Sequence, residues 1–165
     1  MEIREMVPED WEAVRAIYLE GIATGQATFE TSAPSWDQWN SSHLPFARLI
    51  VTTKTDCSVK GWAALAPVSG RSVYAGVAEV SVYVAHDSRG QGLGRQLLTL
   101  LIAEAETNGM WMLQASVFPE NLASIALHES CDFRTVGIRE RIGRMNGLWR
   151  DTLLMERRST VVGSE

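Results

Sequence analysis

The sequence predicts a mixed α/β domain in which a central mixed β-sheet is flanked by helices. Valines at alternate positions within residues 77–84 give the two-residue period of a strand, and the apolar residues of 93–108 give the period of a helix with one buried face. A second apolar run follows at 110–118, so the helix is long enough to cross between two parallel strands. Asn146-Gly147, between two later strand-like runs, is typical of a hairpin turn.

Local signals define the elements before the central strand. Residues 3–6 are expected to form a short first strand. Pro8-Glu9-Asp10 opens the first helix, because proline and acidic residues are favoured in a first helical turn. Residues 23–34 break the helical period and predict a loop. Ser35 and Gln38 then have the spacing of a capping box, which predicts a short second helix.

The rest of the chain completes the element order β-α-α-β-β-β-α-β-α-β-β. Asn121 is a favourable N-cap for a short helix over residues 122–130. We expect one domain over residues 1–158, followed by a flexible tail at 159–165. Four further runs are expected to be strands: 48–53, 59–67, 134–141 and 148–157.

Composition limits the functions that the chain can have. It has 165 residues, of which 45% are apolar and 21% charged, and a formal net charge of −5. A general nucleic-acid-binding protein would present a basic face, so no nucleic-acid partner is expected. No apolar run has the length of a membrane span and the N-terminus lacks a signal-peptide core, which predicts a cytoplasmic protein without a membrane partner. The two cysteines predict neither a disulfide framework nor a metal site.

A glycine-rich segment separates the central strand from the helix at 93–108. Its alternate glycines leave backbone N–H groups unobstructed at the start of a helix, which is an arrangement that binds phosphate. The nucleotide P-loop would need a Lys-Ser/Thr pair after the last glycine, and the dinucleotide fingerprint would need glycine at position 95. The alternative is a turn that only joins strand to helix. The segment reads Arg89-Gly90-Gln91-Gly92-Leu93-Gly94-Arg95.

The pattern Arg/Gln-x-x-Gly-x-Gly/Ala, present from Arg89 to Gly94, resembles the acetyl-CoA loop of the GCN5-related N-acetyltransferase (GNAT) superfamily. The segment from Asn121 to Phe133 resembles a second pattern of that superfamily, Asn-x-x-Ser-x-x-Leu-Tyr/His-Glu-x-x-Gly-Phe. His128 stands at the Tyr/His position of this pattern, and a histidine there resembles the phosphinothricin and methionine-sulfoximine acetyltransferase branch. The resemblance extends over about residues 1–158.

The resemblance implies a GNAT-like fold, acetyl-CoA as co-substrate without a metal, and a homodimer. It implies direct transfer of the acetyl group to the amino group of a small amino-acid-like substrate of the phosphinothricin, methionine sulfoximine, methionine sulfone or arsinothricin type. An N–H near residue 84 would polarise the thioester carbonyl. The residues expected to bind acetyl-CoA are Tyr83, Val84, Ala85, Arg89, Gly90, Gln91, Gly92, Leu93, Gly94, Arg95, Asn121 and Ser124.

Two residues are expected to move protons. Glu79 lies in an apolar strand, where a carboxylate must be solvated by a pocket or paired. It would take a proton from the substrate ammonium, directly or through water; alternatively, it pairs with Arg71 or another cation for structural reasons only. His128, with an ordinary pKa of about 6.5, would protonate the departing thiolate or act as a base. The alternative for His128 is a buried core histidine.

The expected substrate contacts are Phe29, Glu30, Arg71, Tyr74 and Glu79. The Arg71 guanidinium could bind the carboxylate of an amino acid, although a surface arginine explains it equally well.

One position departs from the superfamily pattern. Asp132 replaces a glycine, and aspartate tolerates a left-handed conformation less well than glycine, so a slightly strained turn is expected there. Two other functions remain open: a protein or peptide N-acetyltransferase, and an acetyl-CoA-binding module without turnover.

Overall fold

A seven-stranded sheet with the order β1-β2-β3-β4-β5-β7-β6 runs through the molecule. The computed structural model covers residues 1–165. Only β4 and β5 are parallel, and all other neighbours are antiparallel. The strands are β1 (Glu2–Glu5), β2 (Leu49–Thr52), β3 (Val59–Pro67), β4 (Val77–Val84), β5 (Met112–Val117), β6 (Arg134–Met145) and β7 (Leu148–Arg158).

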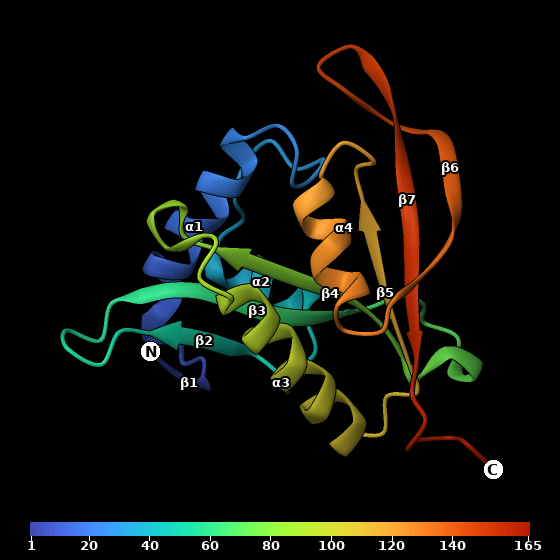
Figure 1. Ribbon diagram of the computed structural model, residues 1–165, viewed down its shortest axis with the longest axis horizontal. Coiled ribbons are helices and arrows are strands. Elements are labelled where there is room, and N and C mark those ends of the chain that lie inside the picture. The colour runs from blue at the N-terminus through green and yellow to red at the C-terminus, as the bar shows by residue number, and fades with distance from the viewer.

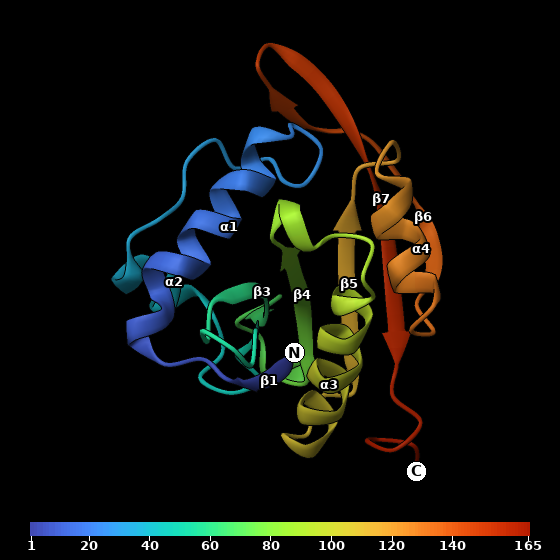
Figure 2. The ribbon, with the colours of Figure 1, turned by 60° about the vertical axis from the view of Figure 1, so that its left-hand side comes forward.

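Helices cover both faces of this sheet, which confirms the predicted fold class. In Figure 2, α1 and α2 lie on one side of β4, and α3 and α4 lie on the other. The helices are α1 (Trp11–Ala23), α2 (Trp36–Ser42), α3 (Leu93–Thr107) and α4 (Leu122–Glu129). Short 3₁₀ turns occur at η1 (Pro8–Asp10), η2 (Ser72–Tyr74) and η3 (His86–Ser88).

The central strand separates two apolar cores, as its alternating pattern predicts. Val80 packs into the core beneath α3, which contains Leu97 and Leu101. Tyr83, on the opposite face of β4, packs against the core beneath α1 and α2, which contains Trp39 and Trp62. The same strand can therefore present Glu79 and Ser81 on the α1–α2 side while Val80, Val82 and Val84 pack against the core beneath α3.

The parallel strands β4 and β5 pair over only part of their length. Their register pairs end at Glu79 and Gln114, although β4 continues to Val84 and β5 to Val117. Figure 1 shows the two strands diverging from a common point. Beyond Glu79, the facing edges of the two strands therefore have no partner in the sheet.

Several local sequence signals are confirmed. Ser35 caps α2 through its hydroxyl while Gln38 reaches back to the Ser35 N–H. Asn121 caps α4, since its Oδ1 accepts a hydrogen bond from the Ser124 N–H at 3.1 Å. Asn146 and Gly147 have φ angles of 50° and 81°, as a type I′ hairpin turn requires.

Some predicted boundaries are wrong. The strand predicted at 134–141 continues to Met145, because pairing with β7 resumes at Gly143 after an irregularity. Arg141 lies within that irregularity at φ 50°, and its N–H is held by the Asp151 carboxylate at 2.7 Å. Pro8-Glu9-Asp10 forms a separate 3₁₀ turn before α1.

The C-terminal segment packs back onto the chain at its start. Ser159 is buried, and its hydroxyl donates to Glu106 at 2.8 Å. The Arg158 guanidinium donates to the carbonyls of Trp111 and Val162. Flexibility of residues 159–165 stays a prediction. No helix in the structure has the length and apolar character needed to cross a membrane.

Candidate active site

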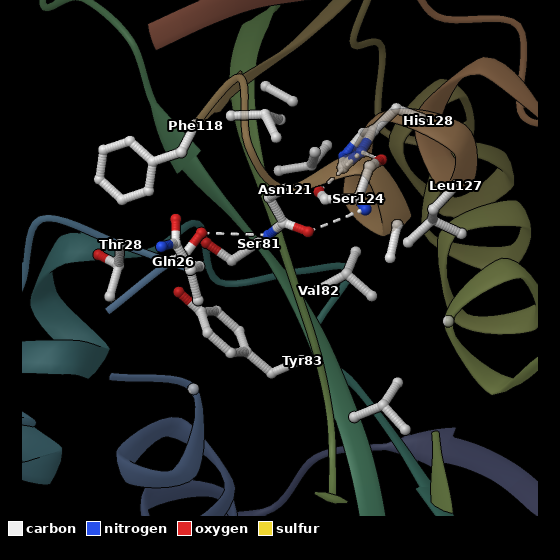
Figure 3. Close-up of a pocket in the computed structure, with 18 of the residues that line it drawn as sticks. Gln26, Thr28, Ser81, Val82, Tyr83, Phe118, Asn121, Ser124, Leu127 and His128 are labelled. Carbon is white, nitrogen blue, oxygen red and sulfur yellow. Dashed lines mark hydrogen bonds between the residues drawn. The ribbon is translucent and has the colours of Figure 1, made fainter. Parts of the chain in front are cut away.

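A cavity of about 890 Å³ lies where β4 and β5 diverge. Its walls are the two strands, the glycine-rich segment, α4 and the loop that follows α1 (Figure 3). The structure thus brings most of the predicted site residues to one place. Those lining the cavity are Phe29, Glu30, Glu79, Tyr83, Val84, Arg89, Gly90, Gly92, Leu93, Gly94, Arg95, Asn121, Ser124 and His128.

Four predicted site residues lie outside this lining: Arg71, Tyr74, Ala85 and Gln91. Arg71 and Tyr74 are exposed at η2, before β4, where the guanidinium lies 5.5 Å from the tyrosine ring centre. No ion pair joins Glu79 to Arg71 or to another cation. Ala85 is buried, and the Gln91 side chain donates to the Asp87 carbonyl at 3.5 Å.

The glycine-rich segment presents a row of unpaired backbone donors at the start of α3. Gly90 and Gly92 have φ angles of 74° and 77°, in the left-handed region that favours glycine. None of the six N–H groups of residues 90–95 donates a hydrogen bond of ordinary geometry within the chain, and the first helical bond runs from Gln96 to Gly92. Such a row at a helix N-terminus is suited to a phosphate.

The inner edge of β4 offers further unpaired groups. The Ala85 N–H bonds to the Lys60 carbonyl at 2.9 Å, and the register of β3 with β4 is regular. Because N–H groups along a strand point alternately to its two sides, those of Val82 and Val84 point away from β3, toward the side where β5 has diverged. An extended ligand in the cavity could therefore pair with β4 as an added strand does.

Glu79 is held by polar residues of the neighbouring strand. Its Oε2 accepts hydrogen bonds from Gln114 Nε2 at 2.9 Å and from the Ser116 hydroxyl at 3.4 Å, while Oε1 has no partner. The carboxylate lines the cavity at the point where strand pairing ends. Sequence reasoning missed Gln114 and Ser116, although polar residues at alternate positions of an otherwise apolar strand were an available signal.

His128 is buried in α4, and its proton position follows from its contacts. Its Nδ1 lies 2.7 Å from the Ser124 carbonyl oxygen, which can only accept a hydrogen bond, so Nδ1 carries the proton. The lone pair is then on Nε2. Burial lowers the pKa of His128, and the bond to Ser124 opposes this with a smaller effect. The imidazole is therefore a neutral proton acceptor near pH 7.

Asn121 fastens α4 to the loop that follows α1. Its Nδ2 donates to the Gln26 carbonyl at 3.1 Å, while its Oδ1 caps α4 through Ser124 (Figure 3). Both the nitrogen and the oxygen of the Asn121 side-chain amide are thus hydrogen bonded within the chain.

Tyr83 faces this loop from β4. Its ring stacks on Trp62, and burial raises the pKa of its phenol. A second cavity, of about 450 Å³, adjoins the first and shares Tyr18, Glu30 and Ser81 with it.

Arg150, in β7, contacts the same loop and was not predicted as a site residue. Its guanidinium donates to the Gly25 carbonyl at 2.5 Å and to Gln26 Oε1 at 2.9 Å. Its guanidinium carbon lies 3.6 Å from the centre of the Phe118 ring, which lines the cavity. The sequence around Arg150 does not indicate these contacts, because they join residues that are more than 120 positions apart.

This combination of diverging parallel strands, a phosphate-type helix start and a cavity carboxylate is accompanied by a family match. Residues 8–133 match the model described as "Acetyltransferase (GNAT) family". That is more than half of the chain, so the chain belongs to the GNAT acetyltransferase family and is an enzyme of the acyltransferase class. The predicted family is confirmed.

Curated relatives place the chain near one branch of this family. It is 34% identical over 163 residues to phosphinothricin N-acetyltransferase of Alcaligenes faecalis, covering 94% of this chain and 81% of the relative. It is also 34% identical over 158 residues to the L-methionine sulfoximine/L-methionine sulfone acetyltransferase of Pseudomonas paraeruginosa, covering 93% and 92% of the two chains.

Solved structures agree on the fold and differ in the substrates that their names carry. A GNAT superfamily phosphinothricin acetyltransferase from Sinorhizobium meliloti, in complex with AcCoA, is similar with a TM-score of 0.88 and 25% identity, over 99% of this chain and 91% of that chain. A ribosomal-protein-alanine N-acetyltransferase from Brucella melitensis is similar with a TM-score of 0.87 and 31% identity, over 96% and 100%.

Proposed function

We propose that this chain transfers the acetyl group of acetyl-CoA to the amino group of a small amino-acid-like substrate. Phosphinothricin, methionine sulfoximine, methionine sulfone and arsinothricin define the substrate type. The names of two relatives and of the Sinorhizobium meliloti structure support this choice. The observation that carries the proposal is the row of six unpaired N–H groups at 90–95, which opens into the cavity that Glu79 lines.

The residues around this row fit a diphosphate. Gly90, Gly92 and Gly94 line the cavity, and a Cβ atom added at Gly90 or Gly92 would meet nothing within 4 Å. Arg89 and Arg95 also line the cavity there and add positive charge. The N–H groups of Val82 and Val84 would hydrogen bond the extended arm of acetyl-CoA, and the Val84 N–H would polarise its thioester carbonyl.

Glu79 would make the substrate amine nucleophilic, because an ammonium group has no free electron pair. The free Oε1 of Glu79 would accept the ammonium proton, directly or through water, while Gln114 and Ser116 hold Oε2. The neutral amine then forms the new N–C bond as the C–S bond of the thioester breaks. Both reactants lie in one cavity, so proximity contributes to the rate.

His128 would carry the second proton, while Glu79 would release the first proton to solvent. In its neutral form, its Nε2 can take up the second proton that the nitrogen loses after attack. It can then pass that proton to the thiolate sulfur, which leaves as a thiol. This cycle begins and ends with the tautomer that Ser124 holds.

The substrate would occupy the α1–α2 side of β4, between Glu79 and the loop residues Phe29 and Glu30. The adjoining second cavity offers room for its side chain. Arg71 and Tyr74 stay proposed contacts, although both lie outside the lining of the two cavities. We also propose a homodimer and no nucleic-acid partner, in line with the acidic net charge.

A thiol-release assay tests this function. Acetyl-CoA is incubated with a panel of amino acids that includes the four analogues, with other amines, and with short peptides. Release with an amino-acid analogue is the expected result. Release only with peptides that begin in alanine would favour the activity named for the Brucella melitensis structure. Acetyl-CoA binding without release with any amine would identify a binding module.

A further inference from the structure

We propose that Arg150 is a positioning residue that holds the acceptor loop, defined here as residues 24–30, against the cavity. It would thereby set the affinity for the amine substrate without affecting acetyl-CoA. This inference rests on the proposed function, because it treats the α1–α2 side of the cavity as the amine site.

The acceptor loop is an important cavity wall with little structure of its own. It contributes Thr24, Gln26, Ala27, Thr28, Phe29 and Glu30 to the lining, although it belongs to no helix or strand. Its internal hydrogen bonds are short-range, such as Gln26 N–H to the Thr24 hydroxyl and Glu30 N–H to the Thr28 hydroxyl. Contacts with distant elements must therefore fix its position.

Arg150 supplies two of these contacts. Its two terminal nitrogens donate to different loop oxygens, one to the Gly25 carbonyl and one to Gln26 Oε1. Only 17% of the Arg150 side chain is exposed, so these bonds are largely shielded from water. The Glu120 carboxylate lies 3.4 Å away but is 64% exposed, and such a pair contributes little. The main partners of the Arg150 guanidinium are therefore two uncharged oxygens of the acceptor loop.

Neighbouring contacts extend from Arg150 to Phe29, which lines the proposed substrate side of the cavity. The Arg150 guanidinium lies over Phe118, and Phe118 meets Phe29 of the acceptor loop edge to face, with 4.9 Å between ring centres. Gly143 of β6 lies against the same Phe29 ring, where an added Cβ would come within 2.6 Å. Gln26 is held twice, through its side chain by Arg150 and through its carbonyl by Asn121. Loss of Arg150 would release one of the two holds and leave Asn121 in place.

Steady-state kinetics and hydrogen exchange of Arg150→Gln test the proposal. We expect KM for the best amine to rise about tenfold, since about 1.4 kcal/mol corresponds to that factor. We expect kcat to change less than about threefold and acetyl-CoA affinity to stay within about twofold. Amide exchange in a peptide spanning 24–30 should accelerate. Arg150→Lys should restore only part of the effect, because an ammonium group cannot span two acceptors as a guanidinium does.

Arg144→Gln is the matched control. Arg144 lies in the same β6–β7 hairpin, next to a tryptophan ring, and its side chain donates to Gly147 and not to the acceptor loop. It should leave KM and loop exchange unchanged. An unaltered KM and unaltered loop exchange in Arg150→Gln would overturn the proposal, as would an equal loss of acetyl-CoA and amine affinity.

A double-mutant cycle with Gln26→Ala keeps the test informative if Arg150→Gln is poorly folded. Gln26→Ala removes one acceptor of Arg150 and should raise KM by less. The two effects should be less than additive if the residues act together, and additivity would contradict the proposal. Loop exchange is measured without substrate, so a chain that acetylates no amine refutes the proposed function while this readout still decides the role of Arg150.

Discussion

Glu79 and Gln114 are the last register pair of the parallel strands, and their side chains are joined by a hydrogen bond of 2.9 Å from Gln114 Nε2 to Glu79 Oε2. The carboxylate therefore sits at the vertex of the diverging strands. One of its oxygens is fixed by β5 and the other is free to face the cavity. This geometry places a carboxylate oxygen at the point where the pairing of β4 and β5 ends.

Glu79→Gln should abolish most turnover while acetyl-CoA binding is retained. The amide cannot accept the ammonium proton, so the chemical step should slow by a factor on the order of 10²–10⁴. Single-turnover kinetics measures that step, and calorimetry measures acetyl-CoA affinity. Gln114→Leu is the companion variant, because it keeps the carboxylate and removes its main anchor, and it should cause a smaller loss. Unchanged turnover in Glu79→Gln, with chemistry limiting, would show that Glu79 is not the base.

Gly92→Val should weaken acetyl-CoA binding by at least about tenfold. Gly92 has a φ of 77° and lines the cavity, so valine strains the turn and its side chain is expected to compete with the anion for space. Gly109→Val controls for strain alone, since Gly109 has a φ of 79° just after the other end of the same helix. Both variants should lose similar stability. Equal acetyl-CoA affinity in the two, measured by calorimetry, would contradict the role of the loop.

His128→Asn should lower kcat about 10²-fold or more, because the amide can keep the bond to the Ser124 carbonyl but has no proton acceptor at the Nε2 position. Burial holds the folded-state pKa of His128 below that of the unfolded chain. Its contribution to stability is therefore complete above a pH of about 6.5 and is lost as the pH falls below that value, where the unfolded chain binds the proton.

This pH dependence has its own measurement. Thermal melts of the wild type at pH 7.5 and 5.5 should differ more than those of His128→Asn. His43, whose pKa burial also lowers, contributes in the same direction in both proteins and so cancels from the comparison. An identical loss of melting temperature in the two proteins would show that His128 is not desolvated in the fold.

Asp132→Gly should stabilise the protein by about 0.5–1 kcal/mol, because Asp132 has a φ of 65° and glycine adopts this conformation without the penalty of a Cβ atom. For a chain of this size the melting temperature should rise by about 1–4 °C. Asp132→Ala should lower it, since alanine keeps the Cβ and loses the local tolerance of aspartate. A drop in stability of the glycine variant would show that the Asp132 side chain makes a stabilising contribution larger than the strain.

Sequence reasoning succeeded where a short stretch determines its own conformation. The capping box at Ser35, the N-cap at Asn121 and the turn at Asn146-Gly147 all depend on residues within a few positions of one another. The left-handed conformation of Asp132 was expected instead from the resemblance to the GNAT pattern, which has glycine there. The alternation around Glu79 likewise predicted which face of β4 it occupies, because strand period fixes the face.

Sequence reasoning failed where two distant segments must meet. Gln114 reaches Glu79 only through the register of two strands separated by α3, and Arg150 reaches Gly25 only once β7 is placed beside the acceptor loop. No short stretch of sequence determines either of these two contacts. Arg71 shows the converse case, since closeness to Glu79 in sequence did not bring its side chain to the carboxylate.

The early end of pairing between β4 and β5 also bears on how the protein avoids aggregation. Free strand edges usually recruit strands from other molecules. Here the unpaired edge of β4 lies within the cavity that is also lined by the acceptor loop, the start of α3 and α4, so these elements restrict the approach of a strand from another molecule. The edge that would be a hazard in an open sheet is thus enclosed by the walls of the cavity in which an extended ligand is proposed to bind.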